Sequence, residues 1–418
     1  MNFINFIISF FYAHPFEKEI KKFLRQLKKN SYADVVEKQL TSLMQKDLAI
    51  LNIYLEWKSR GYKYLKKRHR RKLYANLIAL KADFLKQVEN DTTKFNPIIM
   101  EELKQNNLSF PVYKEKEINY LWQIMRYLEP GKRFIYQEST SFGHLINDPT
   151  KEKLIGDCNQ ITTLYAYFYA LKYPITDLKI KILPEHVCLH FENLDIEATS
   201  GHFANYQKDN QVLSITELIS TNLLDISDSR ETQTEISPKI VLKISQLAYK
   251  ISSNKELVAK NLEIAYKNLA ITSMRENNFE SAIFFIKQTS DRNLLLKTYY
   301  NAAIYYLNNK NFKKAHYYAA LHGDIDLKSN VSLSEANDYY QKDNTKEAIK
   351  IYKKLGKHEM VRACLQKDFF KFYQQVKDIQ TLDQAKTKKS TYLKLRDLAQ
   401  QLQDSEKTQW VESMLGKI

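Results

Sequence analysis

Apolar residues recur at helical spacing through most of the first third of this chain. The pattern predicts helices over residues 16–29, 33–54, 61–90, 96–106 and 115–128. Asn30-Ser31 and the stretch 90–93 interrupt the pattern, and Ser31 and Thr93 are suited to cap the helices that follow. Residues 16–129 are therefore expected to form a helical region.

The pattern changes after Arg133. A mostly apolar helix is predicted to open at Asp157-Cys158 and to end near Lys172, shortly before Pro174. Alternating polar and apolar residues then predict strands over 177–183, 186–191 and 194–198. We interpret residues 130–206 as an α+β core within a mostly helical chain.

The last third contains an internal repeat of 33 residues. Its marks are two sets of alanines in register, and an Asn at the same offset between them: Ala270, Ala303 and Ala336; Ala282, Ala315 and Ala348; Asn278, Asn311 and Asn344. Each unit is predicted to be helix, short turn, helix, with small residues where two helices approach. Three units span about 260–357, and helices at 239–252 and 358–377 are expected to cap the stack.

These patterns divide the chain into six segments. An apolar segment, 1–15, precedes the helical region, and the polar stretch 207–238 is expected to be a loop or linker between core and repeats. Residues 239–377 form the helical repeats, and 378–418 a C-terminal helix, centred on 385–413.

Composition narrows the class of protein. Gly and Pro number only 8 each among 418 residues, which argues against disorder and against an all-β fold. Three cysteines, Cys158, Cys188 and Cys364, do not make a disulfide framework.

The net charge of the chain is +16, and Lys58–Lys72 holds nine Lys or Arg in fifteen residues. We favour a solvated helical face there; the alternative is a surface for an anionic partner. No nucleic-acid-binding motif accompanies it.

The N-terminal apolar run, 3–13, is too short to span a bilayer as a helix. It has the length of a signal-peptide core, but no Lys or Arg precedes it. The alternative is a first element that packs onto the body. We expect a cytoplasmic protein, and keep export as the alternative.

One set of residues has the composition needed for thiol chemistry. Cys158 falls in the first turn of the predicted helix, where free N–H groups and the helix dipole favour a thiolate. His186 is the first residue of the second predicted strand, 186–191. A hairpin with the third strand would bring it beside residues 195–197. A nucleophile, its base and a carboxylate that orients the base are the parts of covalent acyl transfer.

The order of these motifs resembles the catalytic core of the transglutaminase-like superfamily, a papain-related group of cysteine enzymes. The matching residues are Gly156-Asp157-Cys158, His186-Val187 and Glu197-Ala198-Thr199. The resemblance implies that Cys158 is the nucleophile, His186 the base and Glu197 the orienting carboxylate, with Asp195 as the fallback.

The chain departs from this family at two positions. The usual aspartate is Glu197, and the aromatic residue often found two positions after the histidine is Cys188. The 33-residue repeat resembles the tetratricopeptide repeat, an α-α superhelical array whose usual role is to hold a peptide or protein.

Two alternatives to a thiol enzyme remain. His186, Cys188 and His190 alternate along one strand face, as metal ligands could, but one straight strand spreads three such residues over about 13 Å. We therefore expect neither a metal nor a cofactor. The functional hypotheses are cysteine-dependent acyl transfer on peptide or protein amides, by a protease, deamidase or transamidase, and an inactive core that serves as an interaction scaffold through its repeats.

Overall fold

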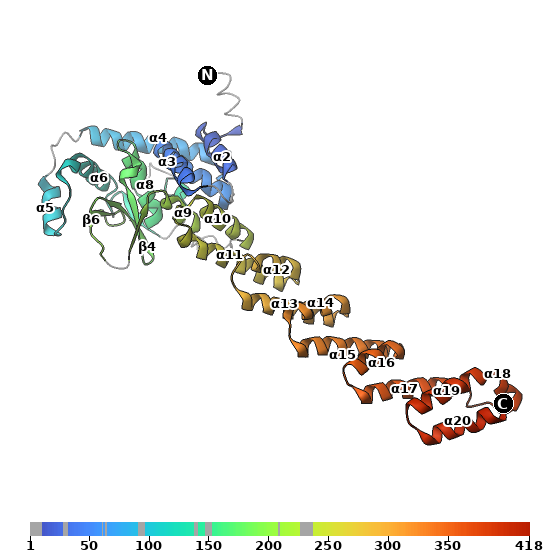
Figure 1. Cartoon of the computed structure of the whole chain (residues 1–418). Helices are drawn as coiled ribbons and strands as arrows, with labels where there is room; N and C mark the ends of the chain where they lie inside the picture. Colours follow the sequence, from blue (N-terminus) through green and yellow to red (C-terminus); the bar gives the residue numbers. More distant parts are fainter. Residues whose placement is uncertain are drawn as a thin grey trace. The chain divides into compact units, whose positions relative to one another are not determined.

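The computed structural model divides the chain into two compact units, Met1–Leu269 and Ala270–Ile418 (Figure 1). The chain is mostly helical, with a small antiparallel sheet in the first unit. The structure describes residues 11–27, 32–60, 62, 65–90, 97–137, 141–146, 153–207, 210–225 and 237–418. No helix in these ranges combines the length and apolar character needed to cross a membrane.

The predicted N-terminal helices are present, with small shifts at their ends. They are α2 (Phe16–Gln26), α3 (Ala33–Leu55), α4 (Lys67–Asn90), α5 (Pro97–Gln105) and α6 (Glu115–Tyr127). Helix α3 is kinked at Asp47 and continues as one π-helical turn, η1 (Glu56–Arg60). Helix α4 begins at Lys67, and the described residues Tyr62, Leu65 and Lys66 are not α-helical as predicted, while residues 61, 63 and 64 lie outside the described ranges. The predicted caps Ser31 and Thr93 lie outside the described residues.

A five-stranded antiparallel sheet follows these helices, in the order β6-β5-β4-β3-β7. The three predicted strands are confirmed as β3 (Lys179–Leu183), β4 (His186–Phe191) and β5 (Leu194–Glu197); β6 (His202–Ala204) and β7 (Gln211–Ser214) extend the sheet on either side. Strands β1 (Phe134–Tyr136) and β2 (Leu154–Gly156) form a separate parallel pair, and the single-turn helix α7 (Phe142–Leu145) lies between them in the chain.

Helix α8 (Cys158–Ala170) is the central element of the first unit and packs on β4 (Figure 1). Its opposite side meets the N-terminal helices: the ring of Phe168 lies 4.4 Å from that of Phe84 in α4 and 5.6 Å from that of Tyr127 in α6. Because the helix is covered on all sides, nearly all of its residues are buried, including the polar Thr162 and Thr163. The helical region and the α+β core therefore share one hydrophobic core rather than forming separate domains.

The expectation of a loop or linker over 207–238 was wrong for residues 211–224; residues 226–236 of that stretch lie outside the described ranges. Strand β7 pairs with β3, and α9 (Glu217–Leu224) is buried in the core through Leu218, Ile219 and Leu223. The apolar runs of these two elements are short and stand among polar residues, so hydrophobic periodicity did not reveal them.

Helix α10 (Pro238–Ile251) and most of α11 (Lys255–Arg275) belong to the first unit, not to the repeats. Helix α10 packs on α9 and η1, and the buried carboxylate of Glu217 fixes the turn after it. Glu217 Oε1 accepts hydrogen bonds from the backbone N–H of Ser253 (2.6 Å) and Asn254 (3.2 Å), and Oε2 accepts one from the Ser252 hydroxyl (2.7 Å). The predicted repeat region therefore starts too early at residue 239.

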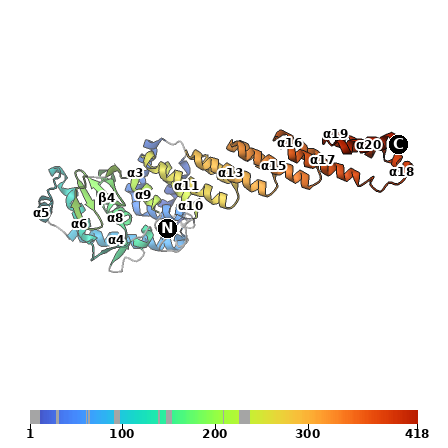
Figure 2. The ribbon, with the colours of Figure 1, turned by 90° about the horizontal axis from the view of Figure 1, so that it is seen from below.

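The helix-turn-helix pairs predicted for the repeat are present, while their likeness to a tetratricopeptide array stays a prediction. The helices are α11, α12 (Phe279–Ile286), α13 (Arg292–Asn308), α14 (Phe312–His322), α15 (Ile325–Gln341) and α16 (Thr345–Lys354), and Figure 2 shows the later pairs in succession. All six alanines that mark the repeat have no exposed surface. The turns repeat as well, because Asn277, Lys310 and Asp343 each have a positive φ of 55–58°.

The expected single C-terminal helix is instead three. After α17 (His358–Tyr373) come α18 (Leu382–Thr387), α19 (Lys389–Gln401) and α20 (Ser405–Lys417). Gln403 adopts a positive φ of 55°, and the side chain of Asp404 caps α20 by accepting from Lys407 N. Helices α19 and α20 thus form a hairpin around Leu395 and Val411, both fully buried.

Candidate active site

Cys158 is the first residue of α8, in a local structure that its neighbours determine. Asp157 caps the helix, with Oδ1 accepting from Gln160 N at 3.1 Å. Gly156 is the last residue of β2; a Cβ there would lie 2.6 Å from Gln160 Oε1 and 3.1 Å from Leu145 Cδ1, so a larger residue would require these side chains to shift. The Cys158 residue is 8% exposed to solvent.

His186 is the first residue of β4, immediately after the tight turn at Pro184-Glu185, where Glu185 has a φ of 56°. Its Nε2 lies 2.7 Å from Glu197 Oε2. The Cys158 thiol is the first cause of the raised pKa of His186, so the two side chains lie close together, and both line the same cleft. The structure thus brings together the three residues predicted from the sequence.

Three further hydrogen bonds fix the Glu197 carboxylate. Oε1 accepts from the Thr199 hydroxyl at 2.6 Å and from Thr199 N at 3.2 Å, while Oε2 accepts from the Tyr206 hydroxyl at 3.1 Å. Thr199 was quoted only as part of a motif, and Tyr206 was missed. Tyr206 follows β6 in an irregular segment, so no periodic pattern signals that its hydroxyl reaches the site.

The contacts of His186 stabilise its protonated form. Hydrogen bonds to Cys158 and Glu197 outweigh burial and raise the pKa of His186 to about 10. Burial favours the neutral form of Glu197, but the hydrogen bonds from His186 and Thr199 prevail, and its pKa lies below the ordinary value. At neutral pH the site therefore contains an imidazolium between a sulfur atom and a carboxylate.

This raised pKa predicts a pH dependence of stability. A group whose pKa rises on folding contributes stability fully below its ordinary value of 6.5, and the contribution is lost as pH approaches 10. The difference in free energy of unfolding between the native chain and His186→Gln should fall over that range, by at most about 1.4 kcal/mol per pH unit. Urea unfolding at several pH values measures it; a difference independent of pH would contradict the assignment.

Asp195, the fallback for Glu197, serves a different histidine. Its carboxylate lies 2.6 Å from His190 Nδ1 and 2.7 Å from Lys181 Nζ, and it also accepts from Tyr206 N at 2.7 Å. Burial raises the pKa of Asp195, but these bonds outweigh it and the pKa falls below its ordinary value. Of the two carboxylates, Glu197 is therefore the one that bonds His186, and Asp195 bonds His190.

The same contacts bear on the metal alternative. His186 and His190 each bond a different carboxylate, and Cys188 between them is fully buried, with a pKa that burial raises. Within the described ranges no group of three His, Cys, Asp or Glu side chains is placed to hold a metal ion.

Cys158 and His186 open into a cleft of about 740 Å³, which we call the thiol cleft. The β3–β4 turn forms one wall, through Leu183 and Glu185. Helices α9 and α11 form the other, through residues that include Leu224, Leu257 and Val258. The second wall comes from segments that the sequence had assigned to a linker and to the repeats, so its position depends on tertiary packing that local patterns do not encode.

Asn159 extends the site toward the end of α9. Its side-chain Nδ2 donates to Asp225 Oδ2 at 3.0 Å, and both residues line the thiol cleft. With Glu185 on the opposite wall, the cleft carries acidic side chains on both sides of the thiol.

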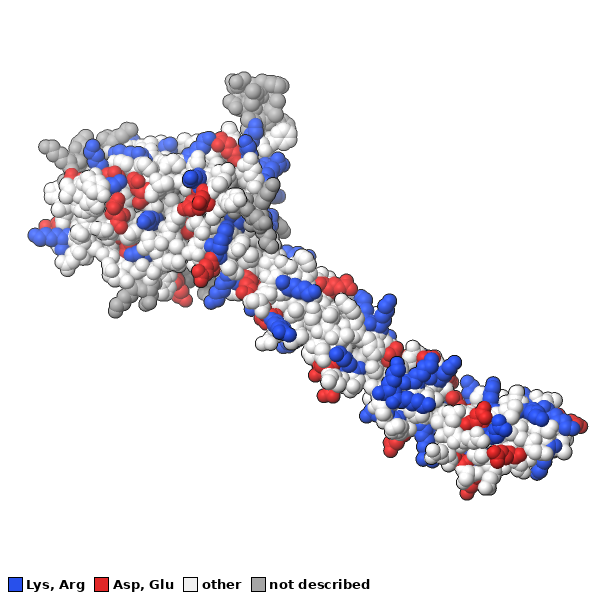
Figure 3. All heavy atoms as spheres, viewed as in Figure 1, with Lys and Arg blue, Asp and Glu red and all other residues white. Residues whose placement is uncertain are grey.

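The basic segment Lys58–Lys72 is not simply a solvated helical face. Arg60 and Arg70 are buried: Arg60 Nη2 donates to the carbonyl of Asn222, and Arg70 Nε lies 2.7 Å from Glu17 Oε1. The apolar residues predicted to continue the helix, such as Leu73 and Leu77, are buried as expected. On the face shown in Figure 3, Lys and Arg are interspersed with Asp and Glu.

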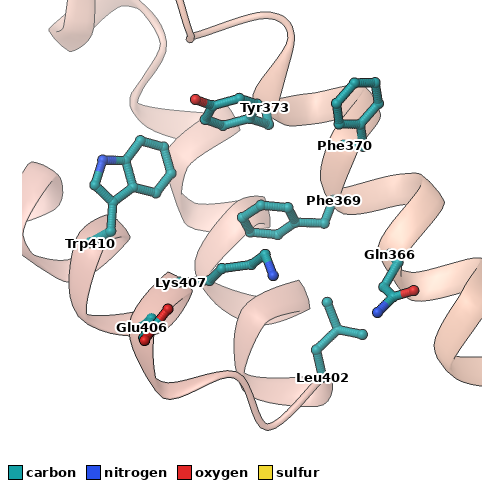
Figure 4. Close-up of a pocket in the computed structure, with 8 residues that line it drawn as sticks. All are labelled: Gln366, Phe369, Phe370, Tyr373, Leu402, Glu406, Lys407 and Trp410. Carbon is teal, nitrogen blue, oxygen red and sulfur yellow. The ribbon is translucent and has the colours of Figure 1, made fainter.

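The second unit has an apolar groove of about 630 Å³ between α17 and the α19–α20 hairpin. The rings of Phe369, Tyr373 and Trp410 lie around it, with Glu406 and Lys407 on the lower side of the view in Figure 4. The rings of Tyr373 and Trp410 meet edge to face at 5.5 Å. Such a groove presents aromatic surface of the kind that anchors peptide side chains.

Comparison of the sequence with protein-family models gave no match, and comparison with curated proteins gave none either.

Proposed function

We propose that this chain is a cysteine-dependent acyl-transfer enzyme acting on peptide or protein amides, with a core of the transglutaminase-like type. The observation that carries the proposal is the position of His186, whose Nε2 lies 2.7 Å from Glu197 Oε2 and whose ring lies beside the Cys158 thiol in the same cleft. A nucleophile, a base and an orienting carboxylate in a row are the parts this chemistry requires. The open thiol cleft gives a substrate access to them.

In this mechanism the Cys158 thiolate attacks the amide carbonyl carbon, and the His186 imidazolium gives its proton to the leaving amine. The C–N bond breaks and a thioester forms. Water or a primary amine then attacks the thioester, neutral His186 accepts its proton, and the C–S bond breaks to regenerate the Cys158 thiolate and the imidazolium. Hydrolysis corresponds to a protease or deamidase, and aminolysis to a transamidase.

The first helical turn supplies stabilisation for the oxyanion. The N–H groups of Cys158 and Asn159 have no carbonyl partner within the helix, as is general for the start of an α-helix. They are oriented toward negative charge at the helix N-terminus. An oxyanion beside the sulfur would accept from them.

The helical repeats are proposed to hold the protein substrate, as a tetratricopeptide-like array would. The aromatic groove supports this role, because Phe370 and Trp410 retain exposed fractions of 61% and 38%. Exposed aromatic side chains around one hollow are typical of surfaces that bind peptide anchors.

The alternative is a scaffold in which the core has no turnover. Glu197 in place of the family's aspartate, and the low exposure of Cys158, favour this alternative. In that case the repeats and the aromatic groove would be the functional part.

Thiol alkylation tests the proposal directly. Iodoacetamide at about pH 6 should modify Cys158 faster than free cysteine, because the imidazolium and the helix N-terminus stabilise the thiolate. Cys188 and Cys364 are internal controls: both are fully buried, with pKa values that burial raises, and should stay unmodified. Mass spectrometry of the digested protein assigns each site.

The outcome separates the two hypotheses. Reaction of Cys158 no faster than free cysteine would show that the thiol is not activated and would favour the scaffold. If Cys158 is activated, a labelled primary amine and isotopically labelled water distinguish aminolysis from hydrolysis of candidate protein substrates.

A further inference from the structure

The first unit contains a second cleft, which shares no residue with the thiol cleft. It measures about 370 Å³ and lies among α2, the end of α3, η1 and α10. We call it the basic cleft. Its volume suits a small molecule rather than a folded partner.

Among the described residues that line the basic cleft, five are cationic and none is Asp or Glu; the five are Lys21, Arg25, Lys58, Lys243 and Lys250. They come from three elements far apart in sequence. Lys243 Nζ donates to the backbone carbonyl of Lys58 at 2.8 Å, which holds α10 against η1. Among the residues that the structure describes, none of the five has a carboxylate oxygen within 4.0 Å.

The cations of the basic cleft lie close enough to act on one another. Burial, and then the charges of Lys21 and Lys243, lower the pKa of Lys58. Like charges gathered around a hollow disfavour one another's charged forms and raise the local concentration of anions. An anionic ligand would relieve that repulsion.

The rest of the lining is mainly apolar. Leu24, Leu27 and Leu247 face the cleft together with Tyr54, whose residue is only 1% exposed. A bare inorganic anion would leave this surface against water. The ligand that suits both parts carries its charge on an apolar body.

We propose that the basic cleft binds a phosphate monoester carried on an apolar chain. Phosphate fits better than carboxylate, because a monoester carries about −1.5 to −2 charges at neutral pH and three strong acceptor oxygens. A single carboxylate would balance only one of the five cations. The apolar chain would cover the leucines.

Isothermal titration of the full-length protein with octyl phosphate, below its micelle concentration, tests this. We expect saturable binding with one site per chain. Inorganic phosphate lacks the apolar chain and octanoate lacks the second charge, so both should bind at least about tenfold more weakly. The measurement does not involve Cys158, so it succeeds or fails independently of the proposed enzyme activity.

Helix α2 provides a matched control. Lys21→Gln/Arg25→Gln removes two cations of the cleft and should weaken octyl phosphate binding at least about tenfold. Lys18→Gln/Lys22→Gln makes the same change in net charge at exposed positions of the same helix outside the cleft, and should leave the affinity within about twofold. Circular dichroism confirms that both variants are folded.

Three outcomes would overturn the proposal: no saturable binding of octyl phosphate, an equal loss of affinity in both variants, or binding only to phosphatidylcholine vesicles that contain phosphatidic acid. The second would indicate a general effect of net charge. The third would indicate a membrane surface as the partner instead of a soluble ligand.

Discussion

Replacing His186 by glutamine is expected to slow alkylation of Cys158 at about pH 6 by roughly 10- to 100-fold. Without the imidazolium, the sulfur loses the positive charge that stabilises its thiolate. An ordinary thiol is less than about 1% ionised at that pH, but a stabilised thiolate is also a weaker nucleophile, which limits the difference. The rate constant with iodoacetamide, followed by mass spectrometry, measures the effect.

The pH profile separates this effect from misfolding. At about pH 9 an ordinary thiol is mostly ionised, so the difference between the native chain and His186→Gln should nearly disappear. A variant that had lost its structure would instead expose Cys188 and Cys364, which are buried in the native chain. Their modification would be visible in the same spectra.

The chain contains a closely matched control for this experiment. His190 lies on the same strand and face as His186, and it also bonds a carboxylate, at 2.6 Å from Asp195. His190→Gln should leave the alkylation rate of Cys158 unchanged, because His190 does not contact the sulfur. Equal slowing by the two substitutions would contradict the role assigned to His186.

The carboxylate can be tested in the same way. Glu197→Gln keeps the shape of the side chain but removes its charge, so the imidazolium loses one of its two stabilising partners. The alkylation rate of Cys158 in Glu197→Gln is expected to lie between its rates in the native chain and in His186→Gln.

The order of Cys158, His186 and Glu197 could be recognised from the sequence because the three lie on adjacent local elements. Short alternating strands predicted the hairpins, and a hairpin places His186 near residues 195–197. The sequence left two carboxylates on one strand face. The choice between them depends on Lys181 and Tyr206, which reach Asp195 and Glu197 through sheet register and an irregular segment.

The limits of the repeats were less predictable than the repeats themselves. Buried alanines at a fixed period are a local signal, and all six are fully buried. Helix α10 has the same kind of pattern, but its apolar side packs on the first unit, through Ile244, Ala248 and Ile251. Which neighbour covers an amphipathic helix is a tertiary property, and periodicity alone does not specify it.

Removal of the Glu17 carboxylate is expected to destabilise the first unit by about 3–5 kcal/mol. Both partners of the Glu17–Arg70 pair are almost completely buried, with side-chain exposures of 0% and 2%. Arg70 Nε lies 2.7 Å from Glu17 Oε1, and the Tyr74 hydroxyl donates to the same oxygen at 2.8 Å. The guanidinium also stacks over the ring of Trp57, at 3.6 Å from its centroid. Glu17→Gln would leave Arg70 as an uncompensated buried charge.

Glu19, which lies on α2 like Glu17, provides the comparison because its ion pair is at the surface. Glu19 lies 2.7 Å from Lys46, but both side chains are more than half exposed. Glu19→Gln makes the same chemical change and should cost less than about 1 kcal/mol. A similar cost for both substitutions would show that burial does not govern the strength of the Glu17–Arg70 pair.

The measurement has to report on the first unit alone. The chain has three tryptophans, of which Trp57 and Trp122 lie in the first unit and Trp410 in the second. Urea unfolding in a Trp410→Phe background, followed by tryptophan fluorescence, therefore reports on the first unit.

The double variant Glu17→Leu/Arg70→Met should recover much of the lost stability, since it removes both charges and leaves neither buried without a partner. Failure to recover would mean that the hydrogen bonds of Tyr74 and Ala13 to Glu17, and not the charge of Arg70, account for the loss.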